Sequence, residues 1–146
     1  MDLNFDTYLN YAQLTEALAT FAAEHPGIVA LGTLGKSYEG RDIPLVVLTH
    51  RETGPDTEKP AFWIDANIHA TELTASMAAL YFIQRMVRGY GQDPQITRIL
   101  DEQAIYVVPR LNPDGAELAL AVPPKFVRSG TRPYPFEDRR DGLYAE

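Results

Sequence analysis

The fold of this chain follows from one stretch, residues 61–72, which reads AFWIDANIHATE. Its first four residues begin an almost unbroken apolar run, which is typical of a strand covered on both faces inside a layered α/β sheet. The run ends in a short polar segment that carries His69 and Glu72. From about Thr74 to Arg88 the pattern becomes helical and is apolar almost all round, so a buried helix is predicted to follow the strand.

Upstream of this stretch, the sequence predicts one helix and one pair of strands. Aromatic and leucine residues recur at spacings of three and four within residues 7–23, as in an amphipathic helix. Two runs rich in Val, Ile and Leu follow, at residues 28–34 and 43–49, joined by a polar link that contains glycine. The length and composition of that link favour an antiparallel pair.

Downstream, the sequence predicts a short helix and a final strand. The dipeptide Asp93-Pro94 places a capping residue before proline, which is typical of a helix start, and residues 104–108 form the last apolar run. The third and last strands are joined through helices and should run parallel with a right-handed crossover. The second and third are joined by only about ten residues and should run antiparallel. We therefore expect an α/β fold with a mixed parallel and antiparallel sheet flanked by helices.

The pattern decays beyond Gly115, and this sets the expected division of the chain. Residues 1–121 are expected to form the α/β part, and residues 122–146, which contain four prolines, a proline-rich extended segment or the start of an insertion. The sequence NPDG at residues 112–115 fits a type I turn, with proline second and glycine fourth. The sequence YEGR at residues 38–41 is interpreted as a hairpin turn, so both motifs are assigned structural roles.

Composition excludes several classes of function. Apolar residues make up 45% of the 146 residues and charged residues 23%, which is ordinary for a globular domain. A net charge of −7 argues against a nucleic-acid partner. The absence of cysteine excludes disulfides, thiolate metal sites and cysteine nucleophiles. No apolar run reaches the roughly 18 residues of a membrane span, and the first residues lack a secretory signal, so we expect a cytoplasmic protein without a membrane partner.

The most informative polar pair is His69 and Glu72. On a helical turn, a spacing of three places both side chains on one face, and an imidazole and a carboxylate are both zinc ligands. The segment follows a strand whose carboxyl end shares an edge with that of the last strand, where ligands bind in open α/β sheets. A metal site is one interpretation. The other is that Glu72 is a carboxylate favoured by the dipole in the first turn of a helix.

A catalytic zinc ion usually has three protein ligands, and no third is evident in this sequence. His25 is expected at the end of a helix, facing solvent. His50 should lie near the start of the third strand, roughly 20 Å from His69. Asp65 could bond to the imidazole, but a buried, hydrogen-bonded structural role is the simpler interpretation.

Three motifs in register resemble the zinc carboxypeptidases of the carboxypeptidase A type, the M14 metallopeptidases. The matching stretches are GKSYEGR at residues 35–41, FWIDANIHATE at residues 62–72 and VPRLNPDG at residues 108–115. The resemblance covers about residues 7–128. It implies a zinc-peptidase type of α/β fold, a hydrolase with Zn²⁺ as its cofactor, and a peptide substrate with a free C-terminus.

The resemblance also implies roles for particular residues. The first His and the Glu of the family motif bind zinc, which corresponds to His69 and Glu72. An arginine downstream of the NPDG stretch stabilises the oxyanion, and the best match is Arg128, with Arg132 as the second choice. Taken as bare residues, both arginines are equally well explained as solvated charges. The family often has arginine just before the ligand Glu, where this chain has Thr71.

The family's catalytic domain is longer than this chain. Its third zinc ligand, the Asn-Arg pair that grips the substrate carboxylate, the lid tyrosine and the general-base glutamate lie beyond the matched region. The resemblance therefore implies the N-terminal half of a catalytic domain, truncated and inactive alone, with the remaining half downstream. Three alternatives stay open: a related zinc amidohydrolase or deacylase that acts on N-acyl amino acids or peptidoglycan peptides, a non-catalytic binding module, and a plain α/β domain.

Overall fold

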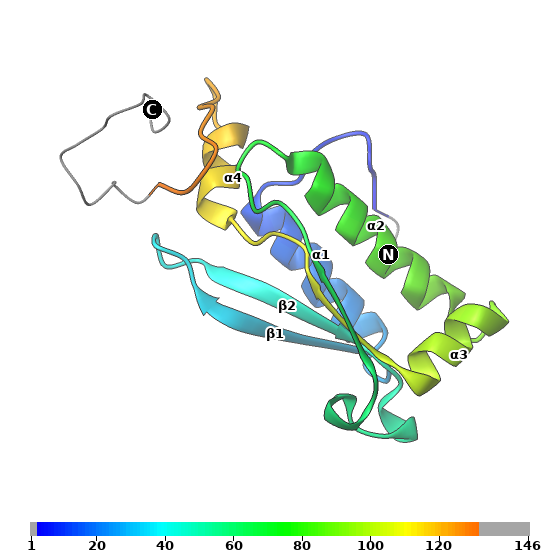
Figure 1. Cartoon of the computed structure of the whole chain (residues 1–146). Coiled ribbons are helices and arrows are strands. Elements are labelled where there is room, and N and C mark those ends of the chain that lie inside the picture. Colours follow the sequence, from blue (N-terminus) through cyan, green and yellow to red (C-terminus); the bar gives the residue numbers. More distant parts are fainter. Residues whose placement is uncertain (1–2, 132–146) are drawn as a thin grey trace.

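The computed structural model describes residues 3–131 of the chain (Figure 1). The strands are β1 (Val29–Lys36), β2 (Asp42–Leu48), β3 (Ala61–Asp65) and β4 (Ala104–Val108). The helices are α1 (Tyr11–Glu24), α2 (Leu73–Gly89), α3 (Pro94–Glu102) and α4 (Pro113–Leu120). Two short 3-10 turns, Arg51–Thr53 and Asp56–Glu58, lie in the link between β2 and β3. None of the helices in this part of the chain combines the length and apolarity needed to span a bilayer.

The four strands form one sheet in the order β1-β2-β4-β3. β1 and β2 pair antiparallel, and β3 and β4 pair parallel, so both predicted strand relations are confirmed. β2 and β3 also run in opposite directions, as predicted, but they are not neighbours because β4 lies between them and pairs antiparallel with β2. The parallel pairing brings the carboxyl ends of β3 and β4 to the same edge of the sheet.

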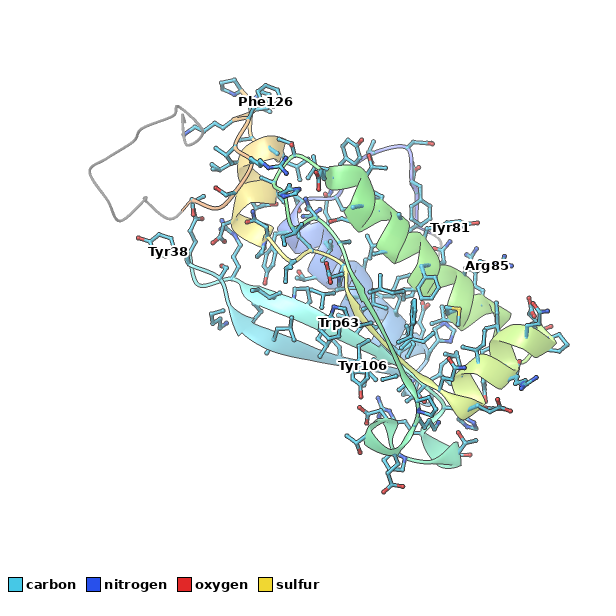
Figure 2. All side chains as sticks on the ribbon, in the orientation of Figure 1. Tyr38, Trp63, Tyr81, Arg85, Tyr106 and Phe126 are labelled. Atoms are coloured by element: carbon cyan, nitrogen blue, oxygen red, sulfur yellow. The ribbon has the colours of Figure 1, made fainter. Side chains whose placement is uncertain are left out.

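The hydrophobic core lies between the helices and one face of the sheet. Burial alternates along β2, so that Val46 and Leu48 face the core, and their partners on β4, Val107 and Ile105, face it too. The buried helical side chains follow the spacing of one helix face: Leu14, Leu18 and Phe21 from α1, Met77, Leu80, Ile83 and Val87 from α2, and Leu100 from α3. α2 was predicted to be a buried helix that is apolar almost all round, but Tyr81 and Arg85 lie on its exposed side (Figure 2).

β3 departs from the expectation of a strand covered on both faces. Among the described residues it is an edge strand, and Phe62 and Trp63 keep 58% and 49% of their surface exposed. The Trp63 ring stacks on Tyr106 of β4, with ring centroids 6.4 Å apart (Figure 2). Its indole N–H donates to the Asp65 carboxylate at 2.8 Å, so Asp65 is hydrogen-bonded but exposed, not buried. The apolar residues of β3 therefore form a surface that is suited to burial but is not covered by residues 3–131.

The NPDG stretch opens a helix and is not an isolated turn. Asn112 is the N-cap of α4, with its side chain accepting from the Gly115 N–H at 2.9 Å. Pro113 takes the first helical position, where a missing N–H costs nothing. The same residue types suit both a type I turn and a helix start, so the sequence alone did not predict α4. Residues 121–131 contain no helix or strand, while Arg132 and the remainder of the expected proline-rich segment lie outside the described residues.

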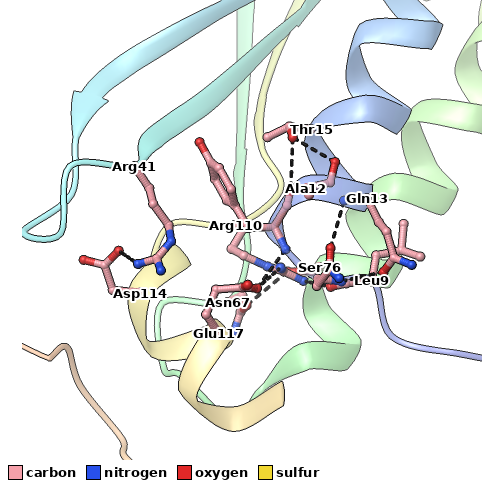
Figure 3. A network of polar contacts seen from close by, with 12 residues as sticks. Leu9, Ala12, Gln13, Thr15, Arg41, Asn67, Ser76, Arg110, Asp114 and Glu117 are labelled. Carbon is pink, nitrogen blue, oxygen red and sulfur yellow. Dashed lines mark hydrogen bonds and ion pairs between the residues drawn. The ribbon is translucent and has the colours of Figure 1, made fainter. Parts of the chain in front are cut away.

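Asp114 joins the hairpin turn to α4. The carboxylate is 3% exposed and accepts from the Ser37 hydroxyl at 2.8 Å, the Glu39 backbone N–H at 2.9 Å and the Arg41 guanidinium at 2.6 Å; Figure 3 shows the contact with Arg41. Burial by itself raises the pKa of the Asp114 carboxyl, but the hydrogen bonds outweigh burial and hold this pKa below its ordinary value. Residues 38–41 and 112–115, both predicted to be turns, are therefore joined to each other through Asp114.

Replacing Asp114 with Asn should destabilise the fold by about 1–3 kcal/mol at neutral pH, because the donors lose their charged acceptor. The pKa of Asp114 is lower in the folded state, so its contribution is present above the unfolded pKa and is lost as the pH falls through the folded pKa. The difference in the free energy of unfolding, measured by urea titration, should shrink below about pH 4. Glu16→Gln, on the exposed face of α1, is the control. A difference for Asp114→Asn that does not change with pH would contradict this account.

Candidate metal-binding site

His69 lies in the loop that leaves β3, at the edge where the carboxyl ends of β3 and β4 meet. Pairing between the two chain segments continues past the ends of the strands. The Ala66 N–H donates to the Val108 carbonyl at 3.0 Å, and the Asn112 N–H donates to the Asn67 carbonyl at 3.1 Å. The two motifs that the sequence placed at this edge are therefore held side by side by backbone hydrogen bonds.

The three residues that the resemblance singled out lie in contact with one another. Nδ1 of His69 is 2.9 Å from Oε1 of Glu72, and Nε2 of His69 is 3.0 Å from a terminal nitrogen of Arg128. Glu72 immediately precedes α2, and its N–H donates to the His69 carbonyl at 3.2 Å. The side chains of His69 and Glu72 are 35% and 51% exposed, so solvent reaches the pair.

These contacts specify the protonation pattern of the imidazole. A guanidinium has donors and no acceptor, so Nε2 of His69 must accept from Arg128. In a neutral imidazole, the single proton then lies on Nδ1 and is donated to the Glu72 carboxylate. A metal ion bound at Nδ1 would require the opposite tautomer, with the proton on Nε2 facing the guanidinium.

The pair fits part of a zinc site. Two ligand atoms bound tetrahedrally at about 2.0–2.1 Å from zinc lie about 3.3 Å apart, close to the observed 2.9 Å between Nδ1 and Oε1. A small separation of the two side chains would therefore make room for the ion. Within residues 3–131, no group of three or more His, Cys, Asp or Glu side chains could hold a metal ion. The described part of the chain thus offers two ligands of a zinc site.

The segment that carries Arg128 is tied to the same edge of the sheet. The Ala70 N–H donates to the Arg128 carbonyl at 2.9 Å, and the Asn112 side-chain amide donates to the Ser129 carbonyl at 2.9 Å. A Cβ added at Gly115 would lie 2.6 Å from the Cβ of Ala70 and 2.8 Å from the Ser129 oxygen. Asn112 and Gly115, predicted as turn residues, are therefore also the residues that allow α4 and the Arg128 segment to approach the loop.

The other two histidines do not contribute to this site. His50 follows Leu48, which pairs with Ile105 near the start of β4, so it lies at the edge of the sheet opposite to His69. His25 is the C-cap of α1 and is partly buried. Among the described residues, neither histidine belongs to a group of three or more potential metal ligands.

Comparison with known proteins adds independent observations. A family model described as zinc carboxypeptidase matches residues 14–135. Carboxypeptidase A2 of Rattus norvegicus is 39% identical over 114 residues, covering 78% of this chain and 26% of the relative. Carboxypeptidase A1 of Bos taurus is 37% identical over 112 residues, covering 77% of this chain and 26% of the relative. The chain thus spans about a quarter of the length of these curated relatives.

The fold is likewise similar to that of a solved structure, carboxypeptidase A from Helicoverpa armigera. The TM-score is 0.79 at 24% identity, and the alignment covers 92% of this chain and 31% of that chain. At this level of identity the likeness concerns the fold, including the mixed sheet that presents His69 and Glu72 at its edge.

The imidazole of His69 should be predominantly the Nδ1–H tautomer in the metal-free chain. Long-range ¹H–¹⁵N correlation spectra, recorded where the ring is neutral, distinguish the two tautomers. Arg128→Ala removes the donor that faces Nε2 and should raise the Nε2–H fraction of His69. The His50 ring, whose Nδ1 faces Asp101 at 3.0 Å, is the internal control and should not change. A His69 ring already in the Nε2–H form in the parent chain would contradict the assigned contacts.

Proposed function

This chain belongs to the zinc carboxypeptidase family, and we propose from that premise that it supplies part of the catalytic centre of a metallocarboxypeptidase. The reaction would be hydrolysis of a C-terminal peptide bond, with a peptide bearing a free C-terminus as the substrate. The observation that carries the proposal is the convergence of His69 Nδ1 and Glu72 Oε1 at 2.9 Å on the edge of the sheet where α/β folds bind ligands.

His69, through Nδ1, and Glu72 would hold the zinc ion. When bound, zinc acts as a Lewis acid and lowers the pKa of a coordinated water molecule. For His69 and Glu72 to act as ligands, the proton between them must leave Nδ1 of His69, because a metal ligand binds through its lone pair. The Ala66–Val108 and Asn67–Asn112 backbone bonds keep the loop in place during this exchange, so the two side chains need only separate slightly.

Arg128 would stabilise negative charge on the substrate carbonyl oxygen. A guanidinium aimed at a developing oxyanion lowers the barrier of acyl transfer, and Arg128 lies 3.0 Å from His69 Nε2, beside the proposed ligands. Its backbone carbonyl is anchored by Ala70, so the segment is fixed while the exposed side chain can turn. With Nδ1 serving as a metal ligand, the neutral His69 ring would carry its proton on Nε2, so Arg128 would lose its acceptor and its guanidinium would be free to bind substrate. Arg132, the second choice, lies outside the described residues.

A complementary stretch of polypeptide would complete the domain. β3 exposes Phe62 and Trp63 and leaves one side of its backbone without a partner strand among the described residues. Exposed apolar edge strands of this kind are templates for further strands. We propose that the remaining half of the catalytic domain pairs with β3 and brings the third zinc ligand and the general base. On this account the isolated chain is inactive.

The isolated chain should bind Zn²⁺ weakly, and the ion should be lost on dialysis at neutral pH because only two ligands are present. His69→Ala and Glu72→Gln should each weaken binding at least about tenfold, measured by competition with a chromogenic chelator. His25→Ala and Glu58→Gln are the matched controls and should leave the affinity unchanged. Stoichiometric zinc that survives dialysis, or equal binding by all four variants, would argue against the proposed ligand pair.

The isolated chain with added zinc should show no turnover of a C-terminal peptide substrate. In a polypeptide that also contains the complementary half, Arg128→Ala should lower kcat by about 10²–10³-fold, as expected for loss of an oxyanion donor. Arg128→Lys should retain part of the activity because the charge is kept. Turnover by the isolated chain would refute the requirement for a second half. Hydrolysis of N-acyl amino acids without peptide hydrolysis would indicate a deacylase.

A further inference from the structure

Arg110 is a charged side chain with no exposed surface, located between β4 and α4 (Figure 3). Its Nε donates to the Ser76 hydroxyl at 3.2 Å, and one terminal nitrogen donates to the Leu9 carbonyl at 2.8 Å. The other terminal nitrogen has no hydrogen-bond partner and lies 3.8 Å from the Glu117 carboxylate. Burial lowers the pKa of Arg110 to about 10, with Glu117 opposing the change, so the side chain remains charged at neutral pH.

The bonds of Arg110 continue into the loop that carries His69. The Ser76 hydroxyl, itself fully buried, donates to Oδ1 of Asn67 at 3.1 Å. The Asn67 amide nitrogen then donates to the carbonyls of His69 at 2.7 Å and Ala70 at 3.3 Å. Two side chains, those of Ser76 and Asn67, therefore link the buried Arg110 cation to two consecutive carbonyls of the loop, those of His69 and Ala70.

Arg110 determines the direction of this series of bonds. Its guanidinium offers donors only, so the Ser76 oxygen must accept from it, and the Ser76 proton is left for Asn67. The Asn67 oxygen then accepts from Ser76, which is the orientation in which the Asn67 nitrogen can also donate to the loop carbonyls. The reverse orientation of the amide would place Oδ1 against the His69 carbonyl, acceptor against acceptor.

The backbone conformation of Asn67 depends on this orientation of its amide. Asn67 has φ +56° and is 2% exposed, and it is the single non-glycine residue with positive φ among residues 3–131. Asn tolerates this left-handed conformation better than most residues, but the conformation persists only where surrounding contacts maintain it. The two bonds from the Asn67 amide to His69 and Ala70 are contacts of that kind, because they close the bend that starts at Asn67.

We propose that Arg110 is a positioning residue that sets the polarity of the Arg110–Ser76–Asn67 relay and so holds the His69 loop in the conformation that presents its side chain beside Glu72. The relay is a property of the chain itself. Only its description as support for a metal ligand rests on the proposed function. Burying a cation with an unbonded donor costs free energy. An apolar side chain at position 110 would avoid this cost, but it could not orient the hydroxyl of Ser76.

Hydrogen exchange in the metal-free 146-residue chain tests the relay without any metal. The readout is the protection of the Ala70 and Glu72 amides relative to that of Val107 in β4, which corrects for a change in global stability. Arg110→Met, which keeps the apolar stem, should lower this ratio at least tenfold. Leu100→Ala, an equally buried change in α3, should leave the ratio within twofold. An unchanged ratio in Arg110→Met would overturn the proposal.

Variants at Asn67 and Ser76 test the same relay if Arg110→Met does not fold. Asn67→Asp replaces the donor nitrogen by an oxygen of the same size, and Asn67→Gly accepts positive φ without any side chain. Both, together with Ser76→Ala, should lower the ratio at least tenfold. Full protection in Asn67→Gly would show that the backbone alone holds the loop and would overturn the proposal.

Zinc titration separates this inference from the proposed function. If Zn²⁺ binds the parent chain through His69 and Glu72, Arg110→Met should weaken that binding at least tenfold, whereas Leu100→Ala should not. Equal zinc affinity together with unchanged exchange in Arg110→Met would overturn the inference while leaving the proposed function intact. If Zn²⁺ does not bind the parent chain, the proposed ligand pair fails, and the exchange ratios alone decide the role of Arg110.

Discussion

The parallel pairing of β3 with β4 is the constraint on which the rest of the structure depends. Two strands joined through α2 and α3 run side by side, so the segments that leave them emerge at one edge of the sheet. The pairing continues through Ala66 and Asn67, which bond to the segment between β4 and α4. The loop of His69, the start of α4 and the segment of Arg128 are therefore brought together by main-chain geometry before any side chain contributes.

Two buried charges, Asp114 and Arg110, then hold the neighbouring elements together, the first by accepting hydrogen bonds and the second by donating them. Asp114 receives donors from the hairpin turn and fixes α4 relative to β1 and β2. Arg110 gives donors to α2 and to the segment before α1. Asp114 can only accept and Arg110 can only donate, so each charge fixes the donor or acceptor role of the groups bonded to it. The surrounding polar groups are consequently held with an orientation that apolar packing, which has no direction, does not impose.

The sequence predicted the parts of this fold that depend on local pattern. The strand directions follow from link lengths, and the proximity of His69 and Glu72 follows from a spacing of three. Contacts between distant residues were beyond its reach: Ser37 and Asp114 are 77 positions apart, and Ser76 and Arg110 are 34 apart. Residues 112–115 were assigned to a turn because a cap followed by proline suits a turn and a helix equally. The prediction that β3 is covered on both faces was wrong for residues 3–131. An apolar run indicates that a strand is suited to burial, but it does not indicate which residues cover it.

The exposed edge of β3 has a consequence for the behaviour of the chain in solution. A five-residue strand that shows Phe62 and Trp63 can recruit the same strand of another copy, and it has no lysine within it to discourage this. The opposing force is the net charge of −7, which acts over a Debye length of about 10 Å at 0.1 M salt. In the isolated chain, repulsion between copies should therefore oppose pairing of β3 edges, and this repulsion weakens as ionic strength rises.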